Sequence, residues 1–382
     1  MGIQKDLVVN GNLLLSAADW SAEIDQKHAA LVNWLRENAL DGILLRRSEN
    51  IAWFTGGAVE LRVLTPSETG VASVLVTAAG RAHYLTTANE APRLHDEEFG
   101  ALDIDPIVFP WYDDRTTEMA LEIAGAHVAC DVPTAGFAAA HLYPLRASLR
   151  ETEITRFRWL GAATGAAVTD VLRQLKLGMT EFEMEAQIAE ALLSRGILPS
   201  VYLMAADERI VKYKHAVARG RKLEKYAMLN LCARKWGLTV SITRFAHFGP
   251  VPAELQRRFA AAAQVNAALL HRTRTGASSA ELFRVAAEAY AQTGFPGAEQ
   301  YHHQGGATGY WEREWVATPE GTERVMDAQA FAWNPSVEGG KVEDTTLLRN
   351  GVIELLTPTP ALPALASSCA GKEYPATGVL EL

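Results

Sequence analysis

Two polar segments near the end of the chain carry residue types that suit chemistry, residues 331–336 with Asn334 and residues 341–345 with Glu343. Carboxylate and amide oxygens are ligands for hard cations, although amides bind weakly when few carboxylates accompany them. Imidazoles transfer protons near neutral pH, and the chain has candidates upstream at His215, His302 and His303. These residue types allow either a metal site or metal-free acid–base chemistry.

The size and composition of the chain fit a two-domain enzyme. It has 382 residues, 48% of them hydrophobic, which is enough for two packed cores. The formal net charge is -9 and no basic tract suits nucleic acid or an anionic membrane. The three cysteines are far apart and odd in number, so neither a disulfide framework nor a zinc knuckle is indicated. With neither a signal-peptide pattern nor an apolar run of about 20 residues, we expect a cytoplasmic protein.

Hydrophobic patterning predicts an N-terminal domain over residues 1–150 and a C-terminal domain over residues 151–382. In the first, short strands and helices form an α/β unit, and no glycine-rich nucleotide loop follows any strand. A long helix over residues 150–176 marks the boundary. Two further helices are each predicted to begin with a capping box, Thr180 with Glu183 and Ser278 with Glu281. Strand pairs at 227–249 and 300–356 complete the second domain.

Four ordered motifs resemble the creatinase / aminopeptidase P / prolidase family. They read NIAWFTGG at 50–57, LGMTE at 177–181, SITR at 241–244 and EDT at 343–345. The first resembles an asparagine-initiated turn of the family's N-terminal domain, and the last resembles its final metal-binding stretch. The resemblance implies an α/β (α+β) protein with an N-terminal creatinase-like domain and a C-terminal pita-bread domain. In the pita-bread domain, helices cover a curved, mostly antiparallel sheet of six strands.

The same resemblance places the family's metal ligands at positions that have mostly lost their charge here. Its two aspartates, one histidine and two glutamates fall at Asn230, Ser241, Gly306, Asn334 and Glu343. Two divalent cations bring about four positive charges, and only one carboxylate remains to offset them. We therefore expect that the protein binds no metal and no other cofactor; in this respect it is similar to creatinase.

The resemblance also suggests roles for the remaining polar residues. His215 aligns with the proton-transfer base of creatinase, and Glu343 would orient the substrate or a water; these two are the predicted catalytic residues. The predicted substrate-binding residues are Asn230, Asn334, His302, His303, Arg313, Thr243 and Arg62. Structural readings stay open, because a buried asparagine can simply satisfy backbone groups and Glu343 can shape a strand end. Family resemblance further implies a homodimer that acts on a small molecule.

Three functions fit these residues. The leading hypothesis is a metal-independent hydrolase of a C–N bond in a small amide, amidine or cyclic urea-like substrate, with a histidine as proton shuttle. Creatine itself fits poorly, because a cationic amidine favours two carboxylates and Thr243 replaces one of them. The alternatives are a non-catalytic binding protein or retired peptidase homologue and, least favoured, a metal-dependent Xaa-Pro peptidase. Lyase or ring-opening chemistry suits the same pocket.

Overall fold

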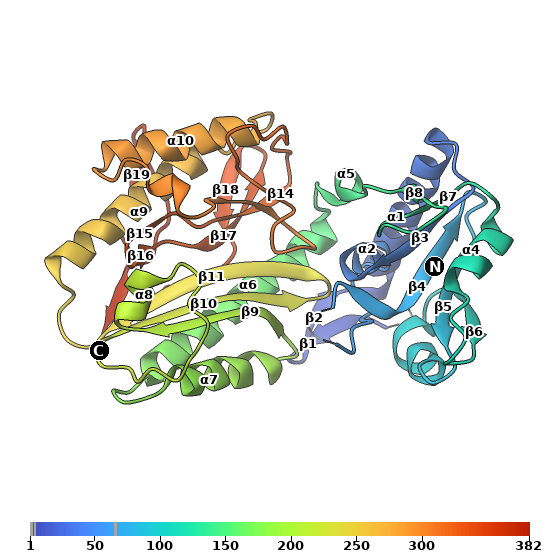
Figure 1. Cartoon of the computed structure of the whole chain (residues 1–382), viewed down its shortest axis with the longest axis horizontal. Helices are drawn as coiled ribbons and strands as arrows, with labels where there is room; N and C mark the ends of the chain where they lie inside the picture. The colour runs from blue at the N-terminus through green and yellow to red at the C-terminus, as the bar shows by residue number, and fades with distance from the viewer. Residues whose placement is uncertain (1–2, 4, 65–66) are drawn as a thin grey trace. The chain divides into compact units, whose positions relative to one another are not determined.

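The structure is a computed structural model that describes residue 3, residues 5–64 and residues 67–382. The chain divides into two compact units (Figure 1). Unit 1 comprises Met1–Arg156 and Trp236–Leu238, and unit 2 comprises Phe157–Lys235 and Thr239–Leu382. Among the described residues, no helix combines the length and apolar character needed to cross a membrane.

Unit 1 is built on a mixed six-stranded sheet in the order β6-β5-β4-β3-β7-β8. Apolar side chains on the central strands form its core, because Leu44, Leu75 and Leu85 from three neighbouring strands pack together. The strands are β3 (Gly42–Arg47), β4 (Thr69–Thr77), β5 (Ala82–Thr87), β6 (Asp105–Phe109), β7 (Val128–Cys130) and β8 (Ala138–Ala139), with a separate hairpin of β1 (Leu7–Val9) and β2 (Asn12–Leu15). The helices are α1 (Ala17–Glu37), α2 (Ser48–Phe54), α3 (Ala91–Arg93), the π-helix η1 (Leu94–Phe99), α4 (Thr116–Ala124) and α5 (Tyr143–Arg146).

The motif at residues 50–57 was predicted to begin with a turn at Asn50, and the structure differs there. Asn50 lies inside helix α2 and does not initiate a turn, because its buried side chain is held by the neighbouring strand: its amide donates to Asp131 Oδ2 at 2.9 Å. The Thr-Gly end of the motif does leave the helix, since Gly57 has φ +75°. A Cβ atom at Gly57 would lie 2.4 Å from the carbonyl oxygen of Trp236, so only glycine fits there.

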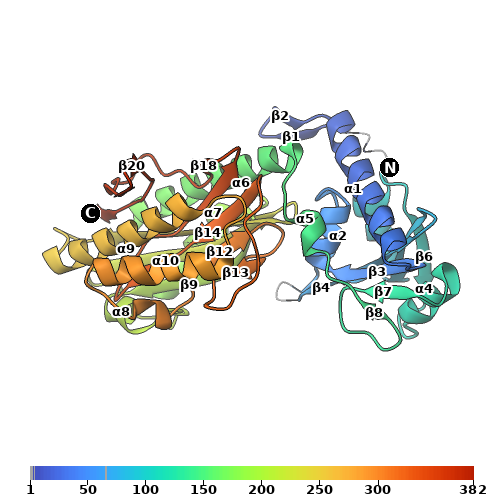
Figure 2. The same cartoon turned by 90° about the horizontal axis from the view of Figure 1, so that it is seen from above.

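Unit 2 contains two sheets and the helices that flank them (Figure 2). The four-stranded sheet has the order β21-β11-β10-β9, and the five-stranded sheet has the order β13-β12-β14-β17-β18. The first sheet comprises β9 (Leu198–Ala206), β10 (Tyr226–Lys235), β11 (Leu238–His247) and β21 (Val379–Glu381). The second comprises β12 (Gly305–Thr308), β13 (Trp315–Val316), β14 (Gln329–Trp333), β17 (Asp344–Arg349) and β18 (Val352–Leu355). The β9–β10 pair and the pairs of the second sheet are antiparallel, whereas β11 and β21 are parallel.

The helices of this unit are α6 (Glu151–Gln174), α7 (Glu181–Leu193), α8 (Glu208–Lys212), α9 (Ala253–Arg272), α10 (Ser279–Gln292) and the 3-10 helix η2 (Ala298–Gln300). Small hairpins are formed by β15 (Ser336–Val337) with β16 (Gly340–Lys341), and by β19 (Ser368–Cys369) with β20 (Lys372–Glu373). Helices α9 and α10 run side by side (Figure 2). The capping box of α7 is confirmed, whereas at α10 only Ser278 caps, because the Glu281 carboxylate pairs with Arg272.

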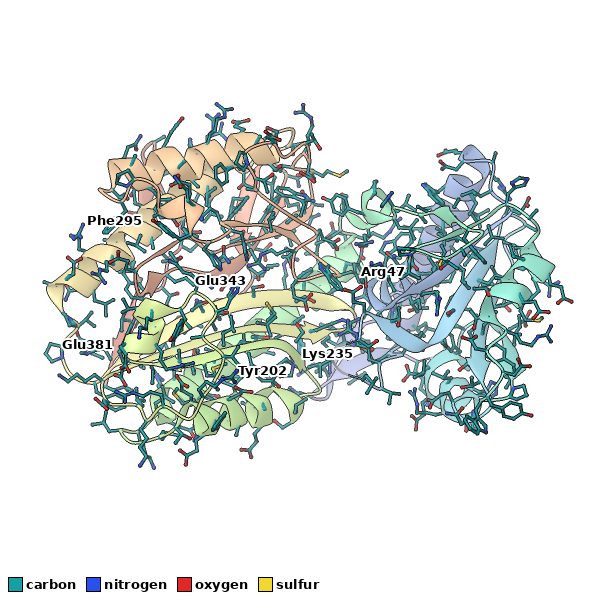
Figure 3. All side chains as sticks on the ribbon, in the orientation of Figure 1. Arg47, Tyr202, Lys235, Phe295, Glu343 and Glu381 are labelled. Carbon is teal, nitrogen blue, oxygen red and sulfur yellow. The ribbon has the colours of Figure 1, made fainter. Side chains whose placement is uncertain are left out.

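The expected single sheet of six strands is instead two sheets that meet at an isolated bridge between Thr243 and Glu343. The β15–β16 hairpin comes just before this point, and the bridge joins Thr243 of β11 to Glu343, the residue that precedes β17. Thr345 extends the junction with its side chain, because its Oγ1 accepts from Ser241 N at 2.8 Å and donates to Ser241 O at 3.0 Å. Figure 3 shows Glu343 beside β11 at this junction.

Arg244 also links the two sheets at this junction through its guanidinium. Its Nη1 donates to the carbonyl oxygens of Thr243 and Glu343 at 2.9 and 3.0 Å, and its Nη2 contacts Asp344 Oδ1 at 2.5 Å. The Arg244 side chain is 1% exposed, so these bonds satisfy a buried charge. The SITR and EDT motifs therefore have a structural task that does not depend on any ligand.

Candidate active site

Glu343 immediately precedes β17 and its carboxylate is enclosed by two cations. Arg313 Nη2 donates to Oε1 at 2.8 Å, Lys341 Nζ lies 2.7 Å from Oε2, and Thr243 Oγ1 donates to Oε2 at 2.5 Å. Burial acts to raise the pKa of Glu343, but Lys341 and Arg313 outweigh it and lower this pKa to about 2. Glu343 is therefore ionised at neutral pH and serves as a counter-ion, not as a proton acceptor.

The guanidinium of Arg313 also reaches Ser241 on β11. Its Nη1 donates to Ser241 Oγ at 2.8 Å and to the carbonyl oxygen of Glu312 at 2.7 Å. Arg313 thus bridges two positions, Ser241 and Glu343, at which the family resemblance places metal ligands. The Cys232 thiol lies 3.2 Å from the same serine hydroxyl, and burial raises its pKa to about 11, so it remains a protonated thiol.

The residues present do not fit a two-metal centre. At Gly306 a Cβ atom would lie 2.0 Å from the carbonyl oxygen of Trp315, so the β12–β13 pairing leaves no room for a histidine there. Arg313 and Lys341 already neutralise Glu343, which is the one carboxylate of the set. Hard cations need several oxygen ligands with compensating charge, and the five positions hold Asn230, Ser241, Gly306, Asn334 and Glu343.

Three histidines form a second cluster, and their hydrogen bonds define their tautomers. His302 Nδ1 lies 2.6 Å from the carbonyl oxygen of His303, which only accepts, so Nδ1 carries the proton. The unprotonated Nε2 of neutral His302 faces His215 Nε2 at 3.0 Å, so His215 donates from Nε2. His215 Nδ1 is then left with a free lone pair. His303 Nδ1 accepts from the backbone N–H of Gly305 at 3.2 Å.

Burial and neighbouring cations keep these imidazoles neutral. Burial, with help from Lys341, lowers the pKa of His215 and brings that of His302 to about 3. Burial and Arg313 lower the pKa of His303 to about 4. One nitrogen from each ring lies within 4.8 Å of the others, a spacing that a metal ion could use. A metal ion there would meet the repulsion of Lys341 and Arg313.

Tyr290 of α10 positions the segment that carries His302. Its hydroxyl donates to Gln304 Oε1 at 2.6 Å and accepts from the backbone N–H of Ser336 at 2.8 Å. Gln304 Nε2 in turn donates to the carbonyl oxygen of His302. Sequence reasoning missed Tyr290, Gln304 and Lys341. The only sequence signal was that Lys341 stands two residues before Glu343, and nothing local marks the other two.

The residues predicted for the site fall into several places. His215, His302 and His303 form the histidine cluster, whereas Thr243, Arg313 and Glu343 form the ion-pair cluster. Asn230 lies in β10 and Asn334 follows β14, both buried, and Asn334 Oδ1 has no hydrogen-bond partner in the described part of the chain. Arg62 belongs to unit 1, in the segment after α2, where its backbone N–H donates to Glu60 Oε1 at 3.1 Å. Its role as a carboxylate clamp stays a prediction.

Comparisons with known proteins cover both units. Residues 155–347 match the model of "Metallopeptidase family M24", and residues 27–156 match that of the "Creatinase/Prolidase N-terminal domain". The comparison with curated proteins gave no match.

Solved structures with a similar fold include the prolidase from Pyrococcus horikoshii OT3, with a TM-score of 0.73, 17% identity and coverage of 87% of this chain and 98% of that chain. Dipeptidase PepE from Mycobacterium ulcerans has a TM-score of 0.72 and 17% identity, with coverage of 95% and 99%. The N-terminal domain of FACT complex subunit SPT16 from Cicer arietinum (chickpea) has a TM-score of 0.62 and 13% identity, with coverage of 89% of this chain and 94% of that chain. Likeness at these identities shows the fold and leaves the activity to the site residues.

Proposed function

The chain belongs to metallopeptidase family M24, and from that premise we propose that it hydrolyses a C–N bond of a small amide-type substrate without the family's two metal ions. The observation that carries the proposal is the position of Arg313, whose guanidinium bridges Ser241 and Glu343. Two side-chain cations, Arg313 and Lys341, stand in this cluster where a carboxylate-rich metal site is implied by the family. A catalyst built this way uses fixed protein charge instead of bound ions.

In the proposed reaction His215 is the general base. Its Nδ1 takes a proton from the water that attacks the amide carbon, while its Nε2–H donates to His302. The C–N bond then breaks, and the imidazolium returns the proton to the leaving nitrogen, so one water is added across the bond. His302 acts as a positioning residue, because its Nδ1–H is committed to the His303 carbonyl and its Nε2 can only accept.

The carbonyl oxygen of the substrate gains negative charge during attack, and the cations favour that charge. Arg313 and Lys341 together exceed the single negative charge of Glu343. Asn334 Oδ1, buried and without a partner among the described residues, is a natural acceptor for a substrate N–H. Asn230, Thr243 and His303 would shape the same pocket. This charge balance favours a neutral or anionic amide or cyclic urea over the cationic amidine.

The test is hydrolysis of a panel of small amides and cyclic ureas by protein treated with a chelator and checked by elemental analysis. We expect turnover to persist without metal and to fall by at least about a hundredfold in His215→Ala, in line with the usual contribution of a general base. The matched control is His271→Ala, a histidine of α9 that contacts Tyr374. Activity that disappears with chelator and returns with manganese would contradict the proposal.

A binding protein without catalysis is the second candidate, because Glu343 has both carboxylate oxygens engaged within the protein. It predicts no turnover in the wild type and unchanged ligand affinity in His215→Ala. We also propose a homodimer in which Arg62 of one subunit serves the other's pocket. Light scattering at micromolar concentration measures that oligomeric state.

A further inference from the structure

A small cavity lies next to the histidine cluster and is bordered by two lysines. Its volume is about 20 Å³, and its polar lining comes from Lys214, His302, Ser336 and Lys341. Apolar side chains of Met228 and Phe245 close another side. The space admits a water-sized atom beside these polar groups.

The charged side chains around this cavity carry more positive than negative charge, which favours the binding of an anion. Lys214 Nζ donates to Ser336 Oγ at 3.1 Å, and no carboxylate of the described residues lies within ion-pair distance of it. Lys341 shares the single carboxylate of Glu343 with Arg313. Glu338, three residues before Lys341 in the sequence, has a side chain that is 70% exposed and pairs with Arg258. Burial and then Lys341 lower the pKa of Lys214, and the attraction of Glu338 only partly offsets them.

We propose that Lys214, Ser336 and Lys341 form a carboxylate-binding subsite, so that the natural substrate is an amide that carries a carboxylate near the bond to be cleaved. Two ammonium groups and a hydroxyl supply donors to the two carboxylate oxygens. His302 lines this cavity and contacts His215 at 3.0 Å, which sets the carboxylate close to the proposed base. The substrate assignment rests on the proposed hydrolase function, whereas anion binding does not.

The experiment compares binding of N-acetylglycine with its neutral counterpart N-acetylglycinamide by calorimetry, with inorganic phosphate as a third probe. We expect the wild type to prefer N-acetylglycine by at least about tenfold, because hydrogen bonds to a charged group are worth that much. The preference should weaken at high salt and largely disappear in Lys214→Met. The control is Lys235→Met, which removes another partly buried lysine of unit 2 whose Nζ donates to the carbonyl oxygens of Arg195 and Gly196.

Equal affinity for the two amides in the wild type overturns the subsite, and so does an equal loss of preference in Lys214→Met and Lys235→Met. Phosphate binding tighter than N-acetylglycine overturns the carboxylate assignment. Should Lys214→Met fail to fold, Ser336→Ala tests the same subsite and should also reduce the preference. If the protein prefers the anion but hydrolyses no amide, the subsite stands and the proposed function is refuted. If it hydrolyses amides but does not prefer the anion, the proposed function stands and the subsite is refuted.

Discussion

Substitution of Glu343 by glutamine should change how the stability of the protein depends on pH. The pKa of Glu343 is lowered from 4.5 to about 2 in the folded state. Between these two values the unfolded chain binds more protons than the folded one, so stability rises with pH through this window. The contribution is complete above about pH 5 and is lost as the pH falls toward 2. A glutamine does not titrate and lacks this dependence.

The magnitude follows from the size of the shift. A fall of the pKa from 4.5 to about 2 corresponds to about 3 kcal/mol, of which about 2 kcal/mol should be lost between pH 7 and pH 3. No correction for solvent screening applies, because the Glu343 side chain is 3% exposed. The stability difference between the wild type and Glu343→Gln should therefore shrink by about 2 kcal/mol over this range.

Urea unfolding at several pH values, followed by tryptophan fluorescence, measures this difference. Glu254 provides the control, since hydrogen bonds from Arg257 and Arg258 also lower its pKa to about 2 but its side chain is 51% exposed. Solvent and salt screen an exposed pair, so Glu254→Gln should show a smaller, salt-sensitive pH dependence. A stability difference for Glu343→Gln that stays constant from pH 7 to pH 3 would refute the buried ion-pair interpretation.

Further measurements address the neighbours of this carboxylate. Lys341→Met should raise the pKa of His215 and move the acid limb of the kcat/KM profile to higher pH, because the lysine lowers that pKa; an unmoved limb argues against His215 as the base. Arg313→Met should cost about 3 kcal/mol, yet combined with Glu343→Gln it should cost clearly less than the sum; additive losses would show that the two do not interact. Tyr290→Phe leaves two buried groups unpaired and should cost about 1–3 kcal/mol in urea unfolding, and a neutral effect contradicts its positioning role.

Much of the architecture was readable from local patterns. The 3.6-residue apolar period and the Thr180–Glu183 capping box predicted helix α7 correctly, because helix boundaries depend on nearby side chains. The motif at residues 50–57 was misjudged at its start, because Asn50 is held by Asp131, which is 81 residues away along the chain. A partner at that distance leaves no trace in the local pattern.

In the candidate site, too, local motifs were readable from the sequence and contacts between distant residues were not. Ordered motifs identified the family, and the resemblance places Asn230, Ser241, Gly306 and Asn334 at four of its five metal-ligand positions, which stays a prediction. The cations that surround Glu343 were not readable from the sequence, because Arg313 stands 30 residues from it. The family resemblance made Arg313 a substrate-binding candidate, which stays a prediction, and the structure pairs its guanidinium with Glu343 and Ser241.

The sequence by itself determined the ordered motifs that identify the family and the residue types available to the candidate site. Only the tertiary structure decided that Arg313 and Lys341 surround Glu343, that His215 meets His302 across 87 residues, and that Lys214 borders a small cavity. The physical reason is that ionic and hydrogen-bond energies depend on the distances between atoms and on burial. Both are set when distant strands pack together.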